Sequence, residues 1–179
     1  MLTVKISPVQ LTEYAATQQV VQWAFSGSQY TDKDEHHLIG RLRQEQDYRA
    51  AFDVAARTTT GKIVGHAMLS EIVIQNQTQV VTALALAPLA VLPDYQHQGI
   101  GGQLINYLEH AARQANYPAI SILGDSVYYG RFGYRPANEF GVKASFAVPA
   151  AFYLLKPPLP EQVAALIGTI QYQRSFNLA

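Results

Sequence analysis

The residues best placed for chemistry lie in a glycine-rich turn between an apolar strand and an amphipathic helix. The strand covers residues 86–92, and after a short polar turn Gly99, Gly101 and Gly102 open the helix. The first N–H groups of a helix have no partner within the helix, and the helix dipole adds positive character there. Glycine lets a bulky anion approach the backbone closely. The pattern therefore predicts a phosphate-binding site.

Two common phosphate-binding motifs do not fit this turn. The third glycine of the dinucleotide fingerprint would fall at Leu104, and no G-K-[ST] sequence follows as in a P-loop. What remains is Q-x-x-G-x-G, formed by Gln96, Gly99 and Gly101 behind a strand that reads L-A-V-x-P. An ordinary strand-to-helix turn with glycine packing is the alternative interpretation.

Together with Y-Y-G-R-F-G-Y at residues 128–134, this pattern resembles the acetyl-CoA loop of the GNAT superfamily of N-acetyltransferases. The resemblance runs over nearly the whole chain, and L-A-P-L-A-V-L-P is similar to a bacterial subgroup of predicted acetyltransferases. It implies a single α/β domain over residues 1–179 with the GNAT fold. This fold has a mixed central β-sheet, splayed at the acetyl-CoA site, with helices on both faces.

The resemblance implies a set of acetyl-CoA contacts. The predicted binding residues are Leu89, Ala90, Val91, Gln96, His97, Gln98, Gly99, Ile100, Gly101, Gly102 and Gln103. The three strand residues would pair with pantetheine as if it were another strand, and the loop amides would hold the pyrophosphate. Gln96 replaces the commoner arginine, while His97 and Gln98 replace a frequent glycine and lysine. These replacements predict modest affinity for the phosphates.

Attack of an amine on a thioester needs a proton acceptor for the amine and a proton donor for the leaving thiolate. Tyr129 matches the family's tyrosine near the CoA sulfur and is the predicted donor, with a packing role as the alternative. Residues 82–91, where many members carry a glutamate, contain no acid. Glu71, an unpaired acid on the neighbouring strand, is the predicted base, but it could equally face solvent. His66 is the other candidate, although a strand histidine is more often structural.

Composition argues against several other functions. The 179 residues are 49% hydrophobic and carry no formal net charge, so neither nucleic acid nor an anionic membrane is a predicted partner. The chain has no cysteine and no H-E-x-x-H motif, and adjacent His36 and His37 are expected on different sides of a helix. No metal site is therefore predicted. The lack of an export signal predicts a cytoplasmic protein.

The element pattern was derived from apolar periodicity and turn residues. Strands are predicted at residues 2–6, 52–57, 62–74, 80–92, 118–123, 135–148, 152–155 and 168–172, and helices at 8–25, 32–46, 101–115 and 161–167, with a short helix within 124–131. Leu104, Ile105 and Leu108 form the sheet-facing side of the third helix. Asp125 is expected to cap the short helix.

The sequence thus predicts an acetyl-CoA-dependent N-acetyltransferase acting on an amine of a small molecule or a protein. A GNAT-fold acyl-CoA-binding or regulatory module without efficient transfer is the alternative. In this fold the first two helices and the tail usually form the acceptor wall. The aromatic residues there hint at an acceptor with an apolar or aromatic part, although ordinary core and surface residues would look the same: Trp23, Phe25, Tyr30, His36 and His37 on one side, and Tyr172 and Phe176 on the other. The acceptor itself, the acyl group, and the choice between monomer and homodimer are left open.

Overall fold

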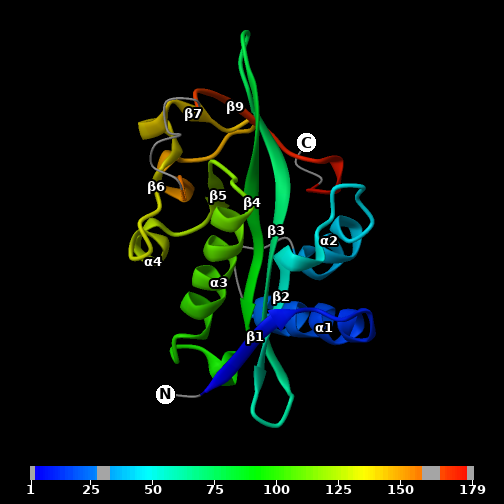
Figure 1. Ribbon diagram of the computed structural model, residues 1–179. Helices are drawn as coiled ribbons and strands as arrows, with labels where there is room; N and C mark the ends of the chain where they lie inside the picture. Colours follow the sequence, from blue (N-terminus) through cyan, green and yellow to red (C-terminus); the bar gives the residue numbers. More distant parts are fainter. Residues whose placement is uncertain (1–2, 28–32, 159–165, 177–179) are drawn as a thin grey trace. The chain divides into compact units, whose positions relative to one another are not determined.

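A computed structural model describes residues 3–27, 33–158 and 166–176, and its elements begin in the predicted order β-α-α-β-β-β-α-β-α-β (Figure 1). The strands are β1 (Val4–Pro8), β2 (Asp53–Thr58), β3 (Ile63–Gln75), β4 (Val80–Val91), β5 (Ile120–Leu123), β6 (Arg135–Pro136), β7 (Val142–Lys143), β8 (Tyr153–Lys156) and β9 (Gly168–Gln171). The α-helices are α1 (Tyr14–Phe25), α2 (Glu35–Leu42), α3 (Ile100–Gln114) and α4 (Ser126–Gly130).

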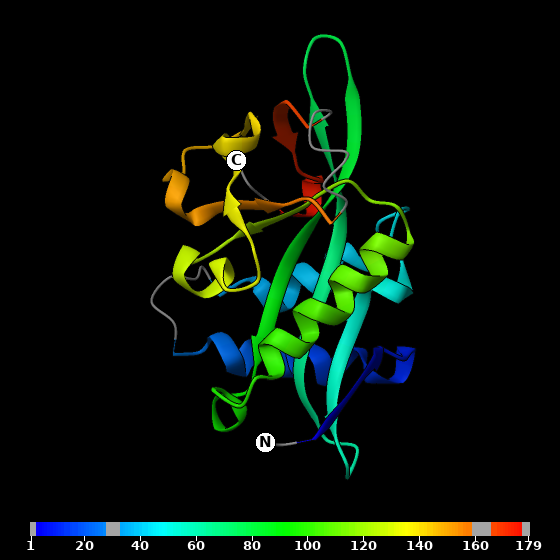
Figure 2. The same ribbon diagram turned by 60° about the vertical axis from the view of Figure 1, so that its left-hand side comes forward.

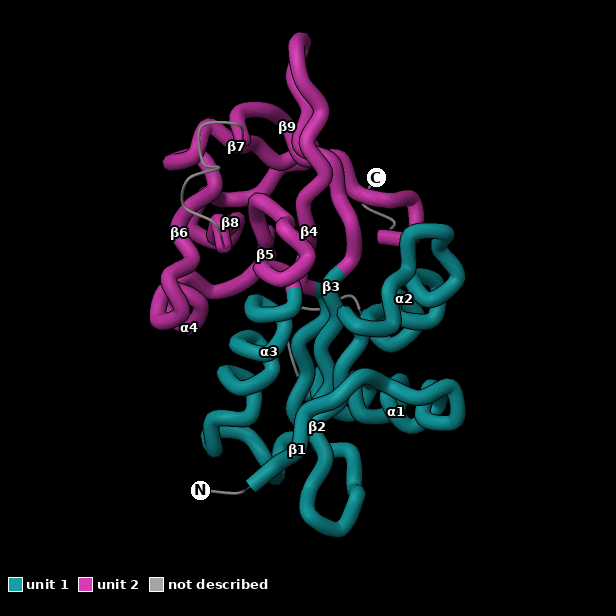
Figure 3. The backbone as a smooth tube through the Cα atoms, in the orientation of Figure 1, with its two compact units in different colours: residues 1–69, 87–111 teal, residues 70–86, 112–179 magenta. Residues whose placement is uncertain are grey.

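The chain divides into two compact units, and each is built from two separate stretches of sequence (Figure 3). Unit 1 comprises Met1–Leu69 and Ala87–Ala111, and unit 2 comprises Ser70–Leu86 and Ala112–Ala179. The long strands β3 and β4 therefore contribute to both units. The single domain over residues 1–179 stays a prediction.

Unit 1 contains a sheet in the order β1-β2-β3-β4 with helices on both faces. Gly65 of β3 faces α3, since a Cβ there would lie 3.2 Å from Leu104 Cδ1. Neighbouring residues of a strand point to opposite faces. His66 accordingly points to the other face, where Asp53 joins it to Arg43 just after α2. In Figure 2, α3 lies in front of these strands and α1 lies behind them.

The apolar face predicted for α3 is confirmed. Leu104, Ile105 and Leu108 are at most 1% exposed. On the opposite face of the unit 1 sheet, Val21 of α1 and Ile39 of α2 are fully buried. Each such side chain contributes roughly 1.5–3 kcal/mol on burial. Packing on both faces therefore holds the start of α3 against the end of β4.

Unit 2 gives the sheet its mixed character. β4 and β5 pair in parallel through Leu84–Ile120 and Ala85–Ser121, whereas β8 is antiparallel to both β5 and β6. β9 pairs with β3 antiparallel and with β7 parallel. The core of this unit is a cluster of buried residues: Ile72, Ile74, Ala83, Ala85, Ala119, Ala137, Phe140, Val142, Tyr153, Leu155, Leu166 and Ile170. The predicted mixed sheet is confirmed, while its splaying at β4 and β5 stays a prediction.

The predicted strand over residues 135–148 is wrong. Only the two-residue strands β6 and β7 form there, separated by a 3-10 turn. Ala137 and Phe140, whose apolar character suggested a strand, are buried within this turn. Gly141 then reverses the chain with a φ of 74°, which glycine adopts without strain. The helix predicted over residues 161–167 lies outside the described residues except for its last two positions.

Other elements also differ from the prediction: β1 covers Val4–Pro8 against the predicted 2–6, and α1 begins at Tyr14 within the predicted 8–25. α2 covers eight residues and ends at Leu42, within the predicted range 32–46, because the chain turns at Arg43. The sequence predicts an interruption at Pro88, because proline has no N–H for the ladder, but β4 continues through this residue. Among the described residues, no helix is both long and apolar enough to cross a membrane.

Candidate functional site

The glycine-rich turn joins β4 to α3 within unit 1. The side-chain amide of Gln96 donates to the carbonyl of Val91 at 3.0 Å and ties the turn to the strand end. His97 and Gly99 both adopt left-handed backbone, with φ of 59° and 81°. Residues other than glycine seldom adopt that conformation. His97 thus holds a backbone conformation that glycine would adopt without strain.

The first turn of α3 presents backbone donors beside this loop. The amide of Gln103 donates to the carbonyl of Gly99 at 3.1 Å, which is the opening hydrogen bond of the helix. The amides of Ile100, Gly101 and Gly102 precede that bond and lie in the first turn. These three amides, with the positive end of the helix dipole, can hold an anion.

Residues 89–91, the predicted pantetheine-binding edge, lie at the end of β4 just before the same turn. Leu89 and Val91 are partly exposed, whereas Ala90 is buried. The amide of Leu92 donates to the carbonyl of Val64 at 2.9 Å, so one edge of β4 is occupied by β3. A Cβ at Gly65 would lie 3.2 Å from the carbonyl oxygen of Ala90. Glycine at position 65 therefore permits this close approach, a role that no sequence pattern indicated.

Tyr129, the predicted proton donor, lies in α4 of unit 2. The carboxylate of Asp125 accepts a hydrogen bond from the amide of Val127 at 2.9 Å, which confirms the predicted cap. The Tyr129 ring packs on Gly124 and stands edge-on to Tyr128, with 4.9 Å between ring centroids. Burial raises the pKa of Tyr129 above its ordinary value. The phenol is therefore protonated at neutral pH and able to donate.

Glu71, the predicted base, lies on the part of β3 that belongs to unit 2. The hydroxyl of Tyr117, which is 7% exposed, donates a short hydrogen bond to the Glu71 carboxylate. A hydrogen bond to a charged group stabilises by about 1.5–3 kcal/mol. The expectation of an unpaired acid is therefore wrong, because its partner comes from 46 positions away in the sequence. The role of Glu71 as base stays a prediction.

A buried polar cluster lies on the α1 and α2 side of unit 1, centred on Asp53 of β2. Arg43 donates from Nε to Oδ2 of Asp53 at 2.8 Å and from Nη2 to Oδ1 at 3.2 Å. Nε2 of His66 lies 2.7 Å from Oδ1 of Asp53. Tyr48 donates to Oδ2 at 3.0 Å, and Arg43 also donates to Oγ1 of Thr17 at 2.9 Å. Of these residues the sequence singled out His66 alone.

Burial and hydrogen bonding set the charges of this cluster. Burial by itself would raise the pKa of Asp53, but hydrogen bonds from His66 and Arg43 outweigh it and lower the pKa to about 2. Burial lowers the pKa of His66, against the opposing effect of Asp53. At neutral pH the cluster therefore holds an ionised carboxylate, a guanidinium and a neutral imidazole. An acid within the apolar run F-D-V-A-A was the signal in the sequence.

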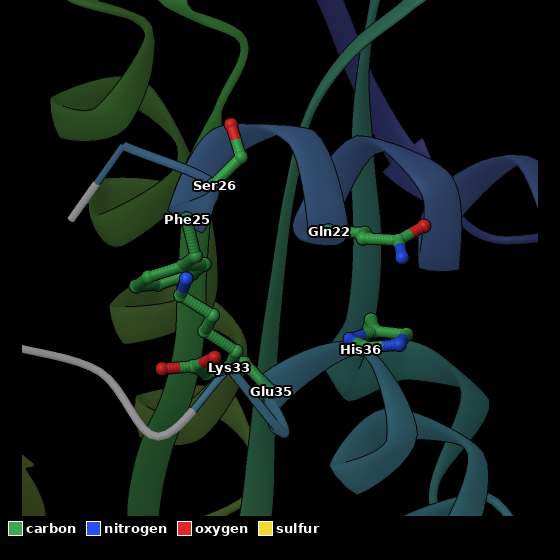
Figure 4. Close-up of a pocket in the computed structure, with 6 residues that line it drawn as sticks. All are labelled: Gln22, Phe25, Ser26, Lys33, Glu35 and His36. Carbon is green, nitrogen blue, oxygen red and sulfur yellow. The ribbon is translucent and has the colours of Figure 1, made fainter.

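A pocket of about 240 Å³ opens between the end of α1 and the start of α2 in unit 1 (Figure 4). Its lining residues are Gln22, Phe25, Ser26, Lys33, Glu35 and His36. Phe25 and His36 belong to the aromatic set predicted for the acceptor wall, and the structure brings both to this pocket. Tyr30, from the same set, lies outside the described residues.

The two adjacent histidines of α2 differ from the expectation. The ring centroids of His36 and His37 are 3.9 Å apart, so they lie together and not on different sides of the helix. Within the part of the chain that the structure describes, no group of three or more His, Asp, Glu or Cys side chains could hold a metal ion.

Comparison with known proteins places these features in a family. The acetyltransferase (GNAT) family matches residues 15–133. The uncharacterized N-acetyltransferase YjhQ of Escherichia coli K12 is 34% identical over 117 residues, which are 64% of each chain. A structure of Escherichia coli YhbS in complex with CoA has a TM-score of 0.85 at 20% identity, covering 99% of this chain and 93% of YhbS. A GNAT acetyltransferase of Brucella melitensis in complex with acetyl-CoA has a TM-score of 0.74 at 24% identity, covering 98% and 99%.

These matches agree with the mixed sheet and with the helix that follows the strand and glycine-rich turn. Together they indicate the acyltransferase class of proteins. The family match covers well over half of the chain, and the chain belongs to the acetyltransferase (GNAT) family of enzymes. The predicted family and fold are therefore confirmed. The matched segment spans just under two thirds of YjhQ, and membership of the bacterial subgroup stays a prediction.

Proposed function

We propose that this chain is an acetyl-CoA-dependent N-acetyltransferase that acylates an amine of a small molecule or a protein. The observation that carries the proposal is the glycine-rich turn of unit 1, which connects the β4 edge to the first-turn amides of α3. Family membership and the complexes of YhbS with CoA and of the Brucella enzyme with acetyl-CoA support the choice of cosubstrate.

In this proposal the backbone does most of the binding. Leu89, Ala90 and Val91 pair with the amides of pantetheine, and the amides in the first turn of α3 hold the pyrophosphate. One N–H of the β4 edge polarises the thioester carbonyl, a contribution of about 3 kcal/mol in comparable sites. Gln96 contributes by fixing the turn and carries no charge for the phosphates. We therefore expect micromolar rather than nanomolar affinity.

The transfer itself requires two proton movements. The amine nitrogen forms a bond with the thioester carbon, the C–S bond breaks, and the electron pair passes to sulfur. Tyr129 supplies the proton that the leaving thiolate takes, and its raised pKa keeps the phenol protonated before the transfer. Glu71 and His66 are the two candidates for the group that accepts the proton of the amine.

Calorimetric titration with acetyl-CoA tests the cosubstrate. Gly101→Glu places bulk and negative charge among the first-turn amides and is expected to abolish binding, while an acid at a helix N-terminus does not harm folding. Asn106→Glu, an exposed position further along α3, is the matched control and should bind like the wild type. Absence of binding in the wild type would refute the proposal. Equal losses of acetyl-CoA binding in both variants would show that the turn does not contribute to the binding site.

Transfer is separated from mere binding by release of free CoA thiol with probe amines. Phenethylamine, spermidine and a lysine-containing peptide cover aromatic, polycationic and protein-like acceptors. Tyr129→Phe is expected to lower kcat by about 100-fold with acetyl-CoA affinity retained, whereas Tyr128→Phe in the same helix should stay near wild type. A wild type that binds acetyl-CoA but acylates none of the probes favours the acyl-CoA-binding alternative.

The acceptor side is proposed to include the pocket between α1 and α2. Its Phe25 ring suits an apolar group and its Glu35 carboxylate suits a cationic amine. Phenethylamine is therefore the probe that we expect to be acylated fastest. A cytoplasmic location and a monomer or homodimer remain predictions from the sequence.

A further inference from the structure

His66 occupies a position that the proposed binding roles leave unexplained. Its side chain is fully buried, and Nε2 lies 2.7 Å from Oδ1 of Asp53. Asp53 is ionised at neutral pH, since its pKa is about 2. A carboxylate can only accept, so the proton of the hydrogen bond belongs to Nε2 of His66. The other ring nitrogen, Nδ1, is therefore an acceptor with a lone pair.

Nδ1 of His66 is buried and has no hydrogen-bond partner among the described residues. A buried acceptor without a partner is costly, and proteins retain few such groups. The histidine also carries no charge to offset this cost at neutral pH, because burial lowers its pKa. The arrangement is that of a neutral imidazole oriented by a carboxylate with a basic nitrogen directed elsewhere, which is the arrangement of a general base.

The position of His66 in the sheet shows where Nδ1 is directed. Strand β3 lies between β2 and β4. The amide of Leu92 donates to the carbonyl of Val64, and in an antiparallel hairpin two residues forward on β3 match two residues back on β4. His66 therefore lies opposite Ala90. Because Nε2 is turned to Asp53 on β2, Nδ1 points away from Asp53, and β4 is the strand on the other side of β3.

Ala90 is the middle residue of the predicted pantetheine edge, and its side chain is a single methyl group. No bulky β4 side chain at that position separates Nδ1 from the edge where the thioester is proposed to bind. The histidine is thus one strand away from the proposed thioester.

We propose that His66 is the proton-accepting residue of the transfer, with Asp53 and Arg43 as positioning residues. The inference rests on the proposed acetyltransferase function. As the amine nitrogen bonds to the thioester carbon and the C–S bond breaks, the amine proton passes through one water to Nδ1. The leaving thiolate takes the proton of Tyr129, and the imidazolium and the tyrosinate then exchange a proton with solvent. One amine and one acetyl-CoA give one amide and one CoA thiol.

Charged and titratable groups facing His66 fit this role. His66 contacts Asp53 of β2, which also accepts from Arg43 after α2 and from Tyr48 before β2. Tyr14 of α1 in turn bonds to Tyr48 at 3.1 Å. Asp53 stabilises the imidazolium that forms, while the Arg43 guanidinium disfavours it. The proton is therefore accepted transiently and returned. Glu71, by contrast, already accepts the hydrogen bond of Tyr117.

The pH profile of kcat/KM for His66→Gln, with acetyl-CoA and the three probe amines, tests the inference. Glutamine can still donate to Asp53, so the cluster keeps a hydrogen bond, but it cannot take a proton. We expect kcat to fall by about 100-fold or more and the acidic limb of the wild-type profile to disappear, with acetyl-CoA affinity within about threefold. His110→Gln, an exposed position on α3, should leave both unchanged.

A His66→Gln enzyme that keeps its kcat within about threefold of wild type, or keeps the acidic limb, overturns the inference while leaving the proposed function intact. If the acidic limb of the kcat/KM profile disappears in Glu71→Gln instead, Glu71 is the residue that accepts the amine proton. Absence of turnover in the wild type defeats the proposed function and the inference with it.

A measurement on the wild type covers the case in which His66→Gln does not fold. Heteronuclear NMR of the histidine ring nitrogens should show His66 with its proton on Nε2 and a lone pair on Nδ1. Its titration midpoint should match the acidic limb of kcat/KM. A proton on Nδ1, or a midpoint that does not match the kinetic limb, would overturn the inference.

Discussion

Replacing Arg43 by methionine tests how strongly the charge pair of unit 1 stabilises the fold. The guanidinium is 4% exposed and donates to both oxygens of Asp53, at 2.8 and 3.2 Å. It also donates to Oγ1 of Thr17 at 2.9 Å and to the carbonyl of Tyr14 at 3.3 Å. Methionine fills part of the same volume but has no donor. In the variant, the buried carboxylate of Asp53 therefore keeps only neutral hydrogen-bond donors.

The expected loss follows from the burial of both partners. Removing one member of a buried ion pair lowers the free energy of unfolding by about 3–5 kcal/mol, because the remaining charge is uncompensated. Arg41 provides a matched control two positions earlier, since its pair with Asp34 has side chains 32% and 36% exposed. An exposed pair contributes about 0–1 kcal/mol. The losses in free energy of unfolding caused by Arg43→Met and Arg41→Met should thus differ by at least about 2 kcal/mol.

Urea unfolding at neutral pH, followed by circular dichroism, gives the free energies of unfolding for both variants. Equal losses for Arg43→Met and Arg41→Met would refute the reasoning, since the buried pair would then contribute no more than a solvated one. The double variant Arg43→Met with Asp53→Asn removes both charges. It should be more stable than Arg43→Met alone, and a double variant that is less stable would also count against the argument.

Three further predictions concern other parts of the structure. Stability should fall by about 2 kcal/mol as the pH drops from about 4 to 2, because the pKa of Asp53 is about 2 in the fold against an ordinary value of 3.8. Acid titration of the free energy of unfolding measures this loss, which Asp53→Asn should lack. Gly168→Ala should lower the free energy of unfolding by about 1–3 kcal/mol, because its Cβ would lie 2.5 Å from the carbonyl oxygen of Gln75. Gly130→Ala is the control: its Cβ would have no atom within 4 Å, so its stability should stay within about 0.5 kcal/mol of wild type. Similar Tm values for the two alanine variants would contradict that expectation. Asp125→Ala removes the cap of α4 and should lower stability by about 1 kcal/mol in thermal unfolding, so an unchanged Tm would deny the cap any contribution.

Features that depend on neighbouring residues could be predicted from the sequence. The spacing of Gly99 and Gly101 behind an apolar strand indicated the turn before α3, and the structure has a strand, a turn and a helix there. Helical spacing of Leu104 and Leu108 indicated the buried face, because burial on one side of a helix repeats with its own period. The cap by Asp125 follows from the same kind of local rule.

The same local rules failed where apolar residues serve a turn. Residues 135–148 have the apolar character of a strand, yet Phe140 is buried within a 3-10 turn and Gly141 reverses the chain. Burial identifies a residue as part of the core without saying which backbone conformation brings it there. Apolar periodicity over so short a stretch is therefore ambiguous.

By itself, the sequence determined the family, the glycine-rich turn and the apolar faces, since each depends on residues a few positions apart. Only the tertiary structure decided which polar groups meet. Asp53 lies 10 positions from Arg43 and 13 from His66, and Glu71 lies 46 from Tyr117. Asp53 and His66 meet because β2 pairs with β3, and Arg43 joins them through the path of the chain after α2. No local sequence pattern specifies such contacts. Burial then fixes their charges, because an ion removed from water is stable only beside its partner.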